Sequence, residues 1–311
     1  MVDQKLFRYS SEVASALAGN KPVVALESTV IAHGLPRPQN LETAFRLEQI
    51  VKKAGAIPAT VAILNGRLCV GLKEEQIRFI AADKDIRKIS IRDLPIAIAQ
   101  SWNGATTVAS TSWIAQCAGI KVFATGGIGG VHRGVPDVSG RDLPSLDVSA
   151  DLPALASTPI VVVCSGAKIV LDLAATREWL ETYGITVVGY QCDEMPAFYS
   201  RSSGLPVDVR VDSSRDVVKL FLAQQSLGIE RALLVTVAVP NKFEIPAAEL
   251  KTVLDAALEE AKRENVAGRQ LTPFLLSCMA QASQGATLAT NIALLENNAR
   301  TAAEIAGQLF T

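Results

Sequence analysis

The sequence has few cysteines, no cysteine pair at metal-binding spacing and no strong excess of charge of either sign. Its five cysteines are scattered without a Cys-x-x-Cys pair, which argues against a zinc site or a disulfide framework and is typical of a reducing compartment. With 30 basic and 31 acidic residues the net charge is −1, so no overall field attracts nucleic acid as a polymer. We therefore expect a small-molecule partner.

Long apolar runs and low-complexity linkers are also missing. Charges at Asp3, Lys5 and Arg8 precede any apolar stretch, and no run approaches eighteen apolar residues, so neither a signal peptide nor a membrane span is expected. A 311-residue chain that is 49% hydrophobic can build a large core without disulfides. We expect a cytoplasmic protein with no membrane partner and a single domain over residues 1–311.

Short β-rich runs alternate with longer helical patterns along the chain. The runs expected as strands are 22–26, 59–64, 88–91, 121–124, 160–164, 186–189 and 232–239. This alternation predicts an α/β fold with a largely parallel sheet covered by helices on both faces. The pair Asn65-Gly66 predicts a hairpin, which makes the sheet mixed.

Three helices have clear boundaries in the sequence. After Asn40 an apolar stripe runs to Ala54, with Asn40 as the expected N-cap and Gly55 at the end. Two alanine-rich helices are expected at about 272–283 and 287–309. They would close over the sheet.

The sequence Cys-Ser-Gly-Ala-Lys at 164–168 places a lysine just after a buried strand. We expect a helix over 168–180, with Lys168 in its first turn. Desolvation and the helix N-terminus would then both disfavour the ammonium form, and a neutral amine can attack a carbonyl-like carbon. The alternative is a solvated lysine that opens an ordinary helix.

A carboxylate follows another buried strand, where Glu27-Ser28-Thr29 precedes the segment 33–38. Burial raises the pKa of a carboxyl group, which suits a general acid. Glu27 could instead cap backbone amides or pair with a buried arginine.

Two further loops combine hydroxyl groups or glycines with strand ends. The hydroxyl cluster at 103–111 offers a phosphate site at a helix N-terminus, although such clusters more often cap the helix. The glycines of 125–134 would allow positive φ and close approach of a ligand. His132 in this loop could equally be a structural donor.

The segment 147–151 has two carboxylates that flank a hydroxyl. Asp147, Ser149 and Asp151 could hold a hard cation through oxygen ligands. The alternative is a helix start in which Ser149 or Asp151 is the cap.

Together these motifs resemble pseudouridine-5′-phosphate glycosidase, also called the indigoidine synthase A-like family. The similarity runs from about residue 21 to the end and rests on 23–29, 33–34, 58–60, 103–111, 125–134, 147–151, 164–168, 272–276 and 290–292. The resemblance implies a three-layer α/β/α homotrimer that depends on Mn²⁺. It also implies reversible cleavage of the C–C glycosidic bond of pseudouridine 5′-phosphate to uracil and ribose 5-phosphate.

The resemblance also implies roles for individual residues. Lys168 would be the nucleophile that forms a Schiff base, Glu27 the proton donor and Asp147 the metal ligand. The implied substrate positions are Lys88, Thr107, Val108, Thr125, His132, Ser149, Ala150, Asp151 and Asn291.

Two departures from the family pattern stand out. Segment 135–146 is longer than expected and adds Asp137 and Asp142 near the metal position, and Ser165 replaces the usual alanine. Two other readings stay open: an enzyme of the same fold that acts on a different sugar phosphate, and a non-catalytic nucleotide-binding protein.

Overall fold

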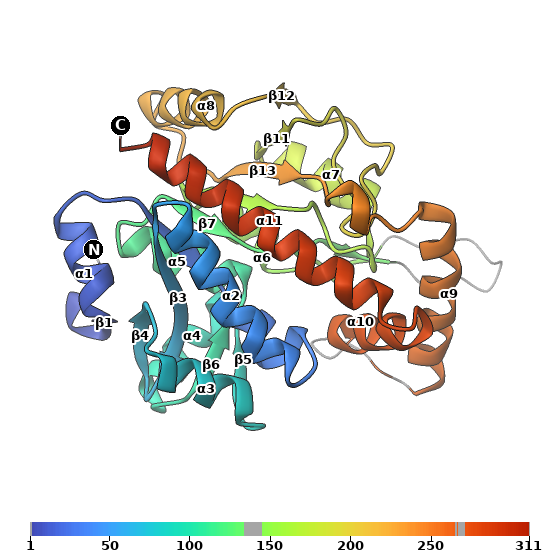
Figure 1. Ribbon diagram of the computed structural model, residues 1–311, viewed down its shortest axis with the longest axis horizontal. Coiled ribbons are helices and arrows are strands. Elements are labelled where there is room, and N and C mark those ends of the chain that lie inside the picture. The colour runs from blue at the N-terminus through green and yellow to red at the C-terminus, as the bar shows by residue number, and fades with distance from the viewer. Residues whose placement is uncertain (1, 134–144, 265, 267–270, 311) are drawn as a thin grey trace.

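An eleven-stranded sheet forms the middle layer of the computed structural model, which describes residues 2–133, 145–264, 266 and 271–310 (Figure 1). Its strands are β1 (Phe7–Tyr9), β2 (Val23–Leu26), β3 (Ile57–Leu64), β4 (Arg67–Val70), β5 (Arg87–Ile89), β6 (Gly104–Thr106), β7 (Val122–Ala124), β9 (Val161–Cys164), β11 (Thr186–Tyr190), β12 (Val209–Val211) and β13 (Leu233–Val237). A second, two-stranded sheet pairs β8 (Val131–His132) with β10 (Leu171–Asp172).

The helices are α1 (Ser11–Ala18), α2 (Gln39–Lys53), α3 (Glu74–Ala82), α4 (Leu94–Ala99), α5 (Val108–Cys117), α6 (Asp151–Leu155), α7 (Leu173–Thr182), α8 (Ser214–Ser226), α9 (Ala247–Arg263), α10 (Leu271–Ala282) and α11 (Ala286–Gln308). A π-helical turn, η2, covers Val30–Gly34. Among the described residues no helix is long and apolar enough to cross a membrane.

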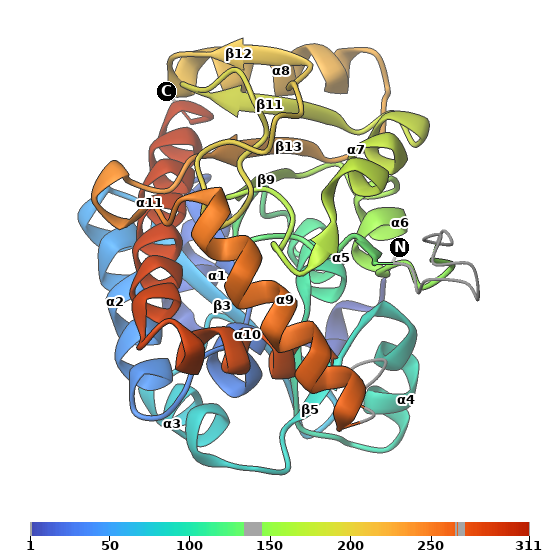
Figure 2. The same cartoon turned by 90° about the vertical axis from the view of Figure 1, so that its right-hand side faces the viewer.

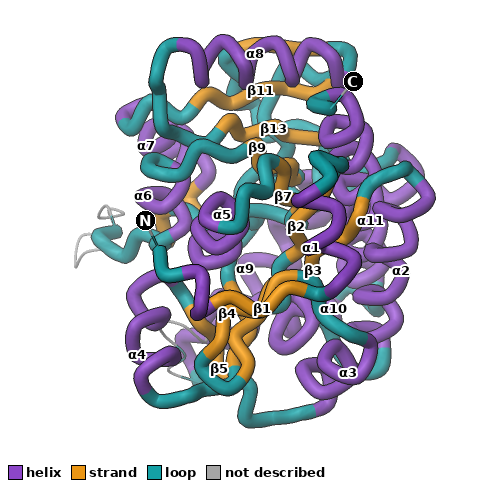
Figure 3. Tube along the Cα trace, turned by 90° about the vertical axis from the view of Figure 1, so that its left-hand side faces the viewer, coloured by secondary structure: helices purple, strands orange, loops and turns teal. Residues whose placement is uncertain are grey.

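The main sheet is mixed and mostly parallel, as the sequence predicts. Its order is β1-β4-β3-β2-β7-β9-β13-β11-β12, and β6 pairs with β3 and β5 off this path. Figure 3 shows β4 toward one end of the sheet and β11 toward the other. Antiparallel pairing occurs where β3 meets β4 and β6. The β3–β4 hairpin turns at Asn65 and Gly66, whose φ values of 48° and 68° confirm the predicted turn.

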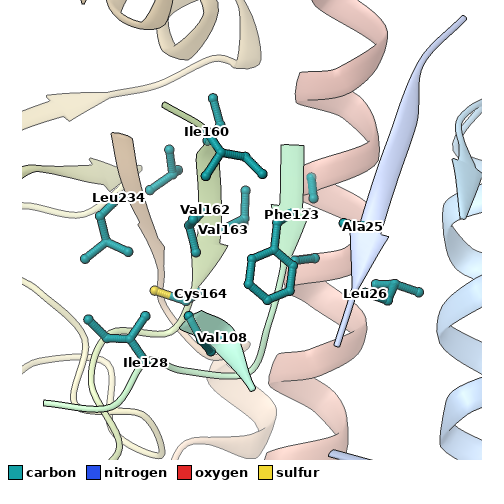
Figure 4. Packing of buried hydrophobic residues seen from close by; sticks show 14 of the residues in the cluster. Ala25, Leu26, Val108, Phe123, Ile128, Ile160, Val162, Val163, Cys164 and Leu234 are labelled. Atoms are coloured by element: carbon teal, nitrogen blue, oxygen red, sulfur yellow. The ribbon is translucent and has the colours of Figure 1, made fainter. Parts of the chain in front are cut away.

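Helices cover both faces of this sheet and produce the three-layer α/β/α architecture that was expected. Figure 2 shows α2 and α11 on one side of the strands and α5, α6 and α7 on the other. The strands between them are apolar on both faces because neither face meets water. Figure 4 shows Phe123 of β7 beside Val162 and Val163 of β9, all of them fully buried.

Two local expectations are wrong. Asn40 is not an N-cap, because α2 already begins at Gln39 and Asn40 is buried inside it, where its amide donates to the carbonyl oxygens of Ile31 (2.9 Å) and Ala81 (3.1 Å). No helix begins at Lys168: the chain first forms β10, and α7 begins at Leu173 with Asp172 as its N-cap. Gly55 does follow the end of α2, with a φ of 88°.

Candidate active site

A cavity lies at the carboxyl ends of the neighbouring parallel strands β2, β7 and β9. The sheet register aligns Leu26 with Ala124, and Ala124 with Val163, so the residues that follow these strand ends meet at one edge. The cavity encloses about 510 Å³ of space, part of it open to solvent. In Figure 2 helices α9 and α10 lie in front of this region, and α10 contributes Thr272, Pro273 and Leu276 to the wall. Ligands of open α/β sheets bind at this edge.

Glu27 is the buried acid of the cavity. Its side chain lines the wall while the residue is only 8% exposed, and the Thr125 hydroxyl donates a hydrogen bond to its carboxylate. Burial raises the pKa of Glu27 above its ordinary value, although the charges of Lys168 and Lys88 and the bond from Thr125 oppose that shift. Glu27 thus accepts a hydrogen bond from a hydroxyl group and feels the charges of two lysines, and burial favours its protonated form.

Lys168 lines the same cavity and is partly buried. Because no helix starts at this residue, the expected contribution of a helix dipole is absent, and proximity to Glu27 is the electrostatic feature that remains. The neighbouring thiol is a poor alternative nucleophile, because burial raises the pKa of Cys164 to about 12. The amine is therefore the better placed nucleophile on this loop.

The glycine loop after β7 binds the Lys168 loop through its backbone. The amide of Ser165 donates to the carbonyl of Gly126 (2.9 Å), that of Ile128 to Gly166 (3.0 Å), and that of Lys168 back to Ile128 (3.1 Å). Further along, β8 pairs with β10. These bonds fix where Lys168 leaves the sheet.

The positive φ expected for the glycines is wrong within the described part of this loop. None of its glycines, Gly126, Gly127, Gly129 and Gly130, has a positive φ. They are needed for close packing instead: a Cβ on Gly129 would lie 2.2 Å from Ser149 Oγ, and one on Gly130 would lie 2.3 Å from Thr176 Oγ1. Gly126 and Gly127 also line the cavity. Gly134 lies outside the described residues.

Asn298 of α11 joins the loops that carry the two candidate catalytic groups. Its fully buried amide nitrogen donates to the carbonyl oxygen of Thr125 at 2.9 Å and lies 3.1 Å from Ser165 Oγ. Thr125 in turn bonds to Glu27, and Ser165 precedes Lys168 on the same loop. The substitution of serine for alanine at 165 therefore adds a contact to this link.

Lys88 and Asn291 also line the cavity, as the resemblance implies. His33, Thr29 and Phe198 are also on the wall, although the sequence motifs assign no role to any of the three. Burial and the charge of Lys88 lower the pKa of His33, against a backbone hydrogen bond with Ile86. Phe198 has a φ of 63°, which is rare for a bulky residue and has no signature in the sequence.

The other implied substrate residues are not among those that line the cavity. Thr107 caps α5 with Ser110, and Val108 begins that helix. Asp151 accepts hydrogen bonds from the amides of Ala109 (2.9 Å) and Gly129 (2.8 Å), so it ties α5 to the glycine loop.

Next to these residues, the segment 147–150 pairs with the glycine loop through its backbone. The Ser149 amide donates to Gly130 at 3.0 Å, that of His132 donates to Asp147 at 2.9 Å, and Ala150 immediately precedes α6. These residues contribute mainly backbone and capping contacts in the structure.

Asp147, the implied metal ligand, has an exposed side chain close to β8. Over the ranges that the structure describes, no group of three or more His, Cys, Asp or Glu residues could hold an ion. Asp137 and Asp142 lie outside the described residues. Among the described residues Asp147 therefore does not belong to a cluster of three or more acidic, histidine or cysteine ligands, and an ion bound there would need other oxygen ligands, water among them.

Comparison with known proteins gives the chain its family. The model of the family described as indigoidine synthase A like protein matches residues 12–308. The chain belongs to this family. A pseudouridine-5′-phosphate glycosidase of Caldanaerobacter subterraneus is 47% identical over 300 residues, which cover 96% of this chain and 95% of that protein. One of Petrotoga mobilis is 45% identical over 295 residues, covering 95% and 94%.

Solved structures of the indigoidine synthase A family and its relatives share the fold. The prealnumycin C-glycosynthase AlnA in complex with ribulose 5-phosphate superposes with a TM-score of 0.88 at 38% identity, covering 99% of this chain and 98% of that one. An indigoidine synthase A-like protein of Thermotoga maritima has a TM-score of 0.87 at 36% identity, covering 98% and 97%. The predicted family and fold are confirmed.

The link through Asn298 predicts a measurable coupling. Asn298→Leu should destabilise the protein by about 1–3 kcal/mol, because a buried carbonyl and hydroxyl lose their partner. Ser165→Ala should cost less, and the two changes together should cost less than the sum of the single changes. Urea unfolding of the four proteins measures this coupling. Asn297→Ala is the control, because Asn297 makes only a 3.4 Å contact to Ala238. Additive losses would show that the link is not a unit.

Proposed function

We propose that this protein is a pseudouridine-5′-phosphate glycosidase, which reversibly splits pseudouridine 5′-phosphate into uracil and ribose 5-phosphate. The observation that carries the proposal is that Glu27, just after β2, and Lys168, on the loop after β9, line one cavity. Relatives at 45% and 47% identity are named for this activity. An acid beside an amine is a suitable pair for covalent catalysis, whereas a non-catalytic nucleotide-binding protein needs neither.

The bond to be broken explains the need for an amine. Uracil is joined to the ribose through C5, and a carbanion at C5 is a poor leaving group. A covalent intermediate divides this barrier into smaller steps. Glu27, whose protonated form is favoured by burial, donates its proton to the ring oxygen as the C1′–O bond breaks and the ribose ring opens, and Lys168 Nζ bonds to C1′.

Release of uracil and hydrolysis of the Schiff base follow in the same site. Nζ gains a positive charge as it bonds to C1′ and passes a proton to the Glu27 carboxylate. Glu27 gives this proton to C5 as the C1′–C5 bond breaks, which releases uracil and leaves a protonated Schiff base between C1′ and Lys168. Water then adds to C1′, the C1′–N bond breaks, and the amine and ribose 5-phosphate are released. Lys88 and Asn291 on the cavity wall would position the substrate, with the cation of Lys88 suited to its phosphate.

We further propose that Mn²⁺ binds Asp147, with water and substrate oxygens as the other ligands. An exposed carboxylate is a hard oxygen donor of the type that such an ion accepts. When bound, the ion would supply positive charge to oxygen atoms of the substrate. We also propose a cytoplasmic homotrimer; the five cysteines are free, as a reducing compartment requires.

A second candidate differs only in the group joined to the sugar. AlnA, which shares this fold, is a C-glycosynthase whose structure was solved in complex with ribulose 5-phosphate. An enzyme of this fold can therefore form C-glycosides with another partner. Release of uracil from pseudouridine 5′-phosphate, against other C-nucleotides offered in parallel, separates the two candidates.

Lys168 should be the residue that carries the sugar. The parent protein with Mn²⁺ should release uracil from pseudouridine 5′-phosphate. Borohydride added with ribose 5-phosphate should leave a stable adduct, because reduction converts the Schiff base to a secondary amine. Peptide mass mapping should locate the adduct on Lys168, Lys168→Ala should lose both signals, and Lys73→Ala, an exposed control, should keep them. An adduct on Lys88 would show that the nucleophile is wrong.

Glu27→Gln should separate catalysis from stability. It should lower kcat by about 10²–10⁴ because it removes the transferable proton. The raised pKa means that the folded state favours the neutral carboxyl group, so the parent should lose stability as the pH rises from the ordinary value of 4.5 through the raised one. Glutamine does not ionise, so thermal unfolding at pH 5 and pH 8 should show a smaller loss of stability with rising pH for Glu27→Gln than for the parent.

The matched control for this variant is Glu48→Gln. Burial also raises the pKa of Glu48, which accepts a hydrogen bond from Thr60 outside the cavity. It should change the pH dependence of stability while leaving kcat near that of the parent. Unchanged kcat in Glu27→Gln would contradict the proton-donor role.

Metal dependence has its own test. A chelator should remove activity without unfolding the chain, because a single carboxylate ligand holds the ion weakly. Asp147→Asn should need more Mn²⁺ to reach half of the parent activity, and Asp137→Asn and Asp142→Asn should behave like the parent. Titrating activity with Mn²⁺ measures this, and the reverse pattern would place the metal in segment 135–146.

A further inference from the structure

We propose that Nε2 of His33 accepts a hydrogen bond from an O–H or N–H group of the bound substrate and thereby selects its sugar or base. This inference rests on the proposed function and names a substrate contact within the same site. His33 lies in η2 and lines the cavity together with Lys88 and Glu27. No hydrogen-bond partner for its buried Nε2 is found in the part of the chain that the structure describes.

A buried nitrogen without a partner costs about 1–3 kcal/mol, so its place on a cavity wall needs an explanation. The turn that carries it is held firmly. The amides of Ile31 and Ala32 both donate to the carbonyl of Ser28 at 3.0 Å, and Asn40 donates to the carbonyl of Ile31 at 2.9 Å. These bonds hold the backbone of His33 at the cavity wall, and we infer that a bound ligand supplies the partner that Nε2 lacks.

The second ring nitrogen determines what Nε2 can do. The hydrogen bond between the ring and the backbone of Ile86 raises the pKa of His33, which identifies the ring as the donor. Because Nε2 has no partner among the described residues, this donor is Nδ1. Burial and the charge of Lys88 outweigh that bond and lower the pKa, which favours the neutral ring. A neutral imidazole with its proton on Nδ1 presents a lone pair at Nε2.

An acceptor of this kind is selective. Ribose hydroxyls and the N–H groups of uracil can donate to it, whereas ionised phosphate oxygens can only accept. The phosphate instead suits a cation such as Lys88, on the same wall. A substrate that has both a hydrogen-bond donor and a phosphate would thus find an acceptor and a cation on the same wall.

The test compares His33→Phe with His33→Gln. Phenylalanine keeps a flat ring but has no acceptor, and glutamine offers Oε1 at a reach similar to that of Nε2. Calorimetric titration should show that His33→Phe weakens binding of either ribose 5-phosphate or uracil about tenfold, whereas His33→Gln stays within about threefold of the parent. The ligand that is weakened identifies the donor as sugar or base. Inorganic phosphate, used as a competitor, should bind all three proteins equally.

Three outcomes would overturn the inference. They are unchanged binding of both ligands in His33→Phe, equal losses in the two variants, or a loss of inorganic phosphate binding, which would make His33 an anion contact. Thermal unfolding of each variant separates these results from a failure to fold. Because binding of ribose 5-phosphate and uracil is measured without turnover, an inactive parent protein would count against the proposed function and not against this contact.

Discussion

The arrangement of the site depends on one buried amide, that of Asn298. It hydrogen-bonds to the loop after β7 and contacts the loop after β9, although Thr125 precedes it by 173 positions in the sequence. Through Thr125 it reaches Glu27, and through Ser165 it reaches the loop of Lys168. A helix near the end of the described chain therefore sets the spacing between acid and amine. Catalytic groups must be held within a fraction of an ångström, and a fully buried hydrogen-bonded side chain is a suitable means.

The same region carries an energetic conflict. Burial disfavours the charge on Glu27, while Lys168 and Lys88 favour it, and burial prevails. Glu27 therefore contributes less to stability than an apolar residue would at this position. Its charged form is buried away from water, and its neutral form does not pair with the lysine charges. The large apolar sheet beneath the site can offset this cost, and the proposed role of Glu27 as proton donor depends on the effect of burial.

The sequence predicts the frame of this molecule better than its loops. Buried strands and the Asn-Gly hairpin have local signatures, so the sheet, Glu27 and Lys168 could be placed at one edge from pattern alone. The start of α7 could not be predicted, because residues in 168–172 form backbone hydrogen bonds with the glycine loop, which is a tertiary contact. The N-cap prediction for Asn40 is wrong for a related reason: its side-chain amide donates to the carbonyl oxygens of residues outside its own helix. The place of Phe198 on the cavity wall has no local signature in the sequence, because it results from the tertiary structure.

The polar loops that look most like ligand sites are largely occupied by the protein itself. Asp151 takes the amides of Ala109 and Gly129, and the hydroxyl of Ser110 donates to Ile89. Helix starts and glycine turns follow the ends of the parallel strands, and many of their polar groups already have hydrogen-bond partners within the protein. Chemistry at this edge then falls to side chains on the cavity wall that can gain a partner from the ligand. His33 belongs to that group, because its Nε2 is buried without a partner among the described residues. The unmet hydrogen bond of a wall residue is thus more informative about substrate contacts than the polarity of the loops around it.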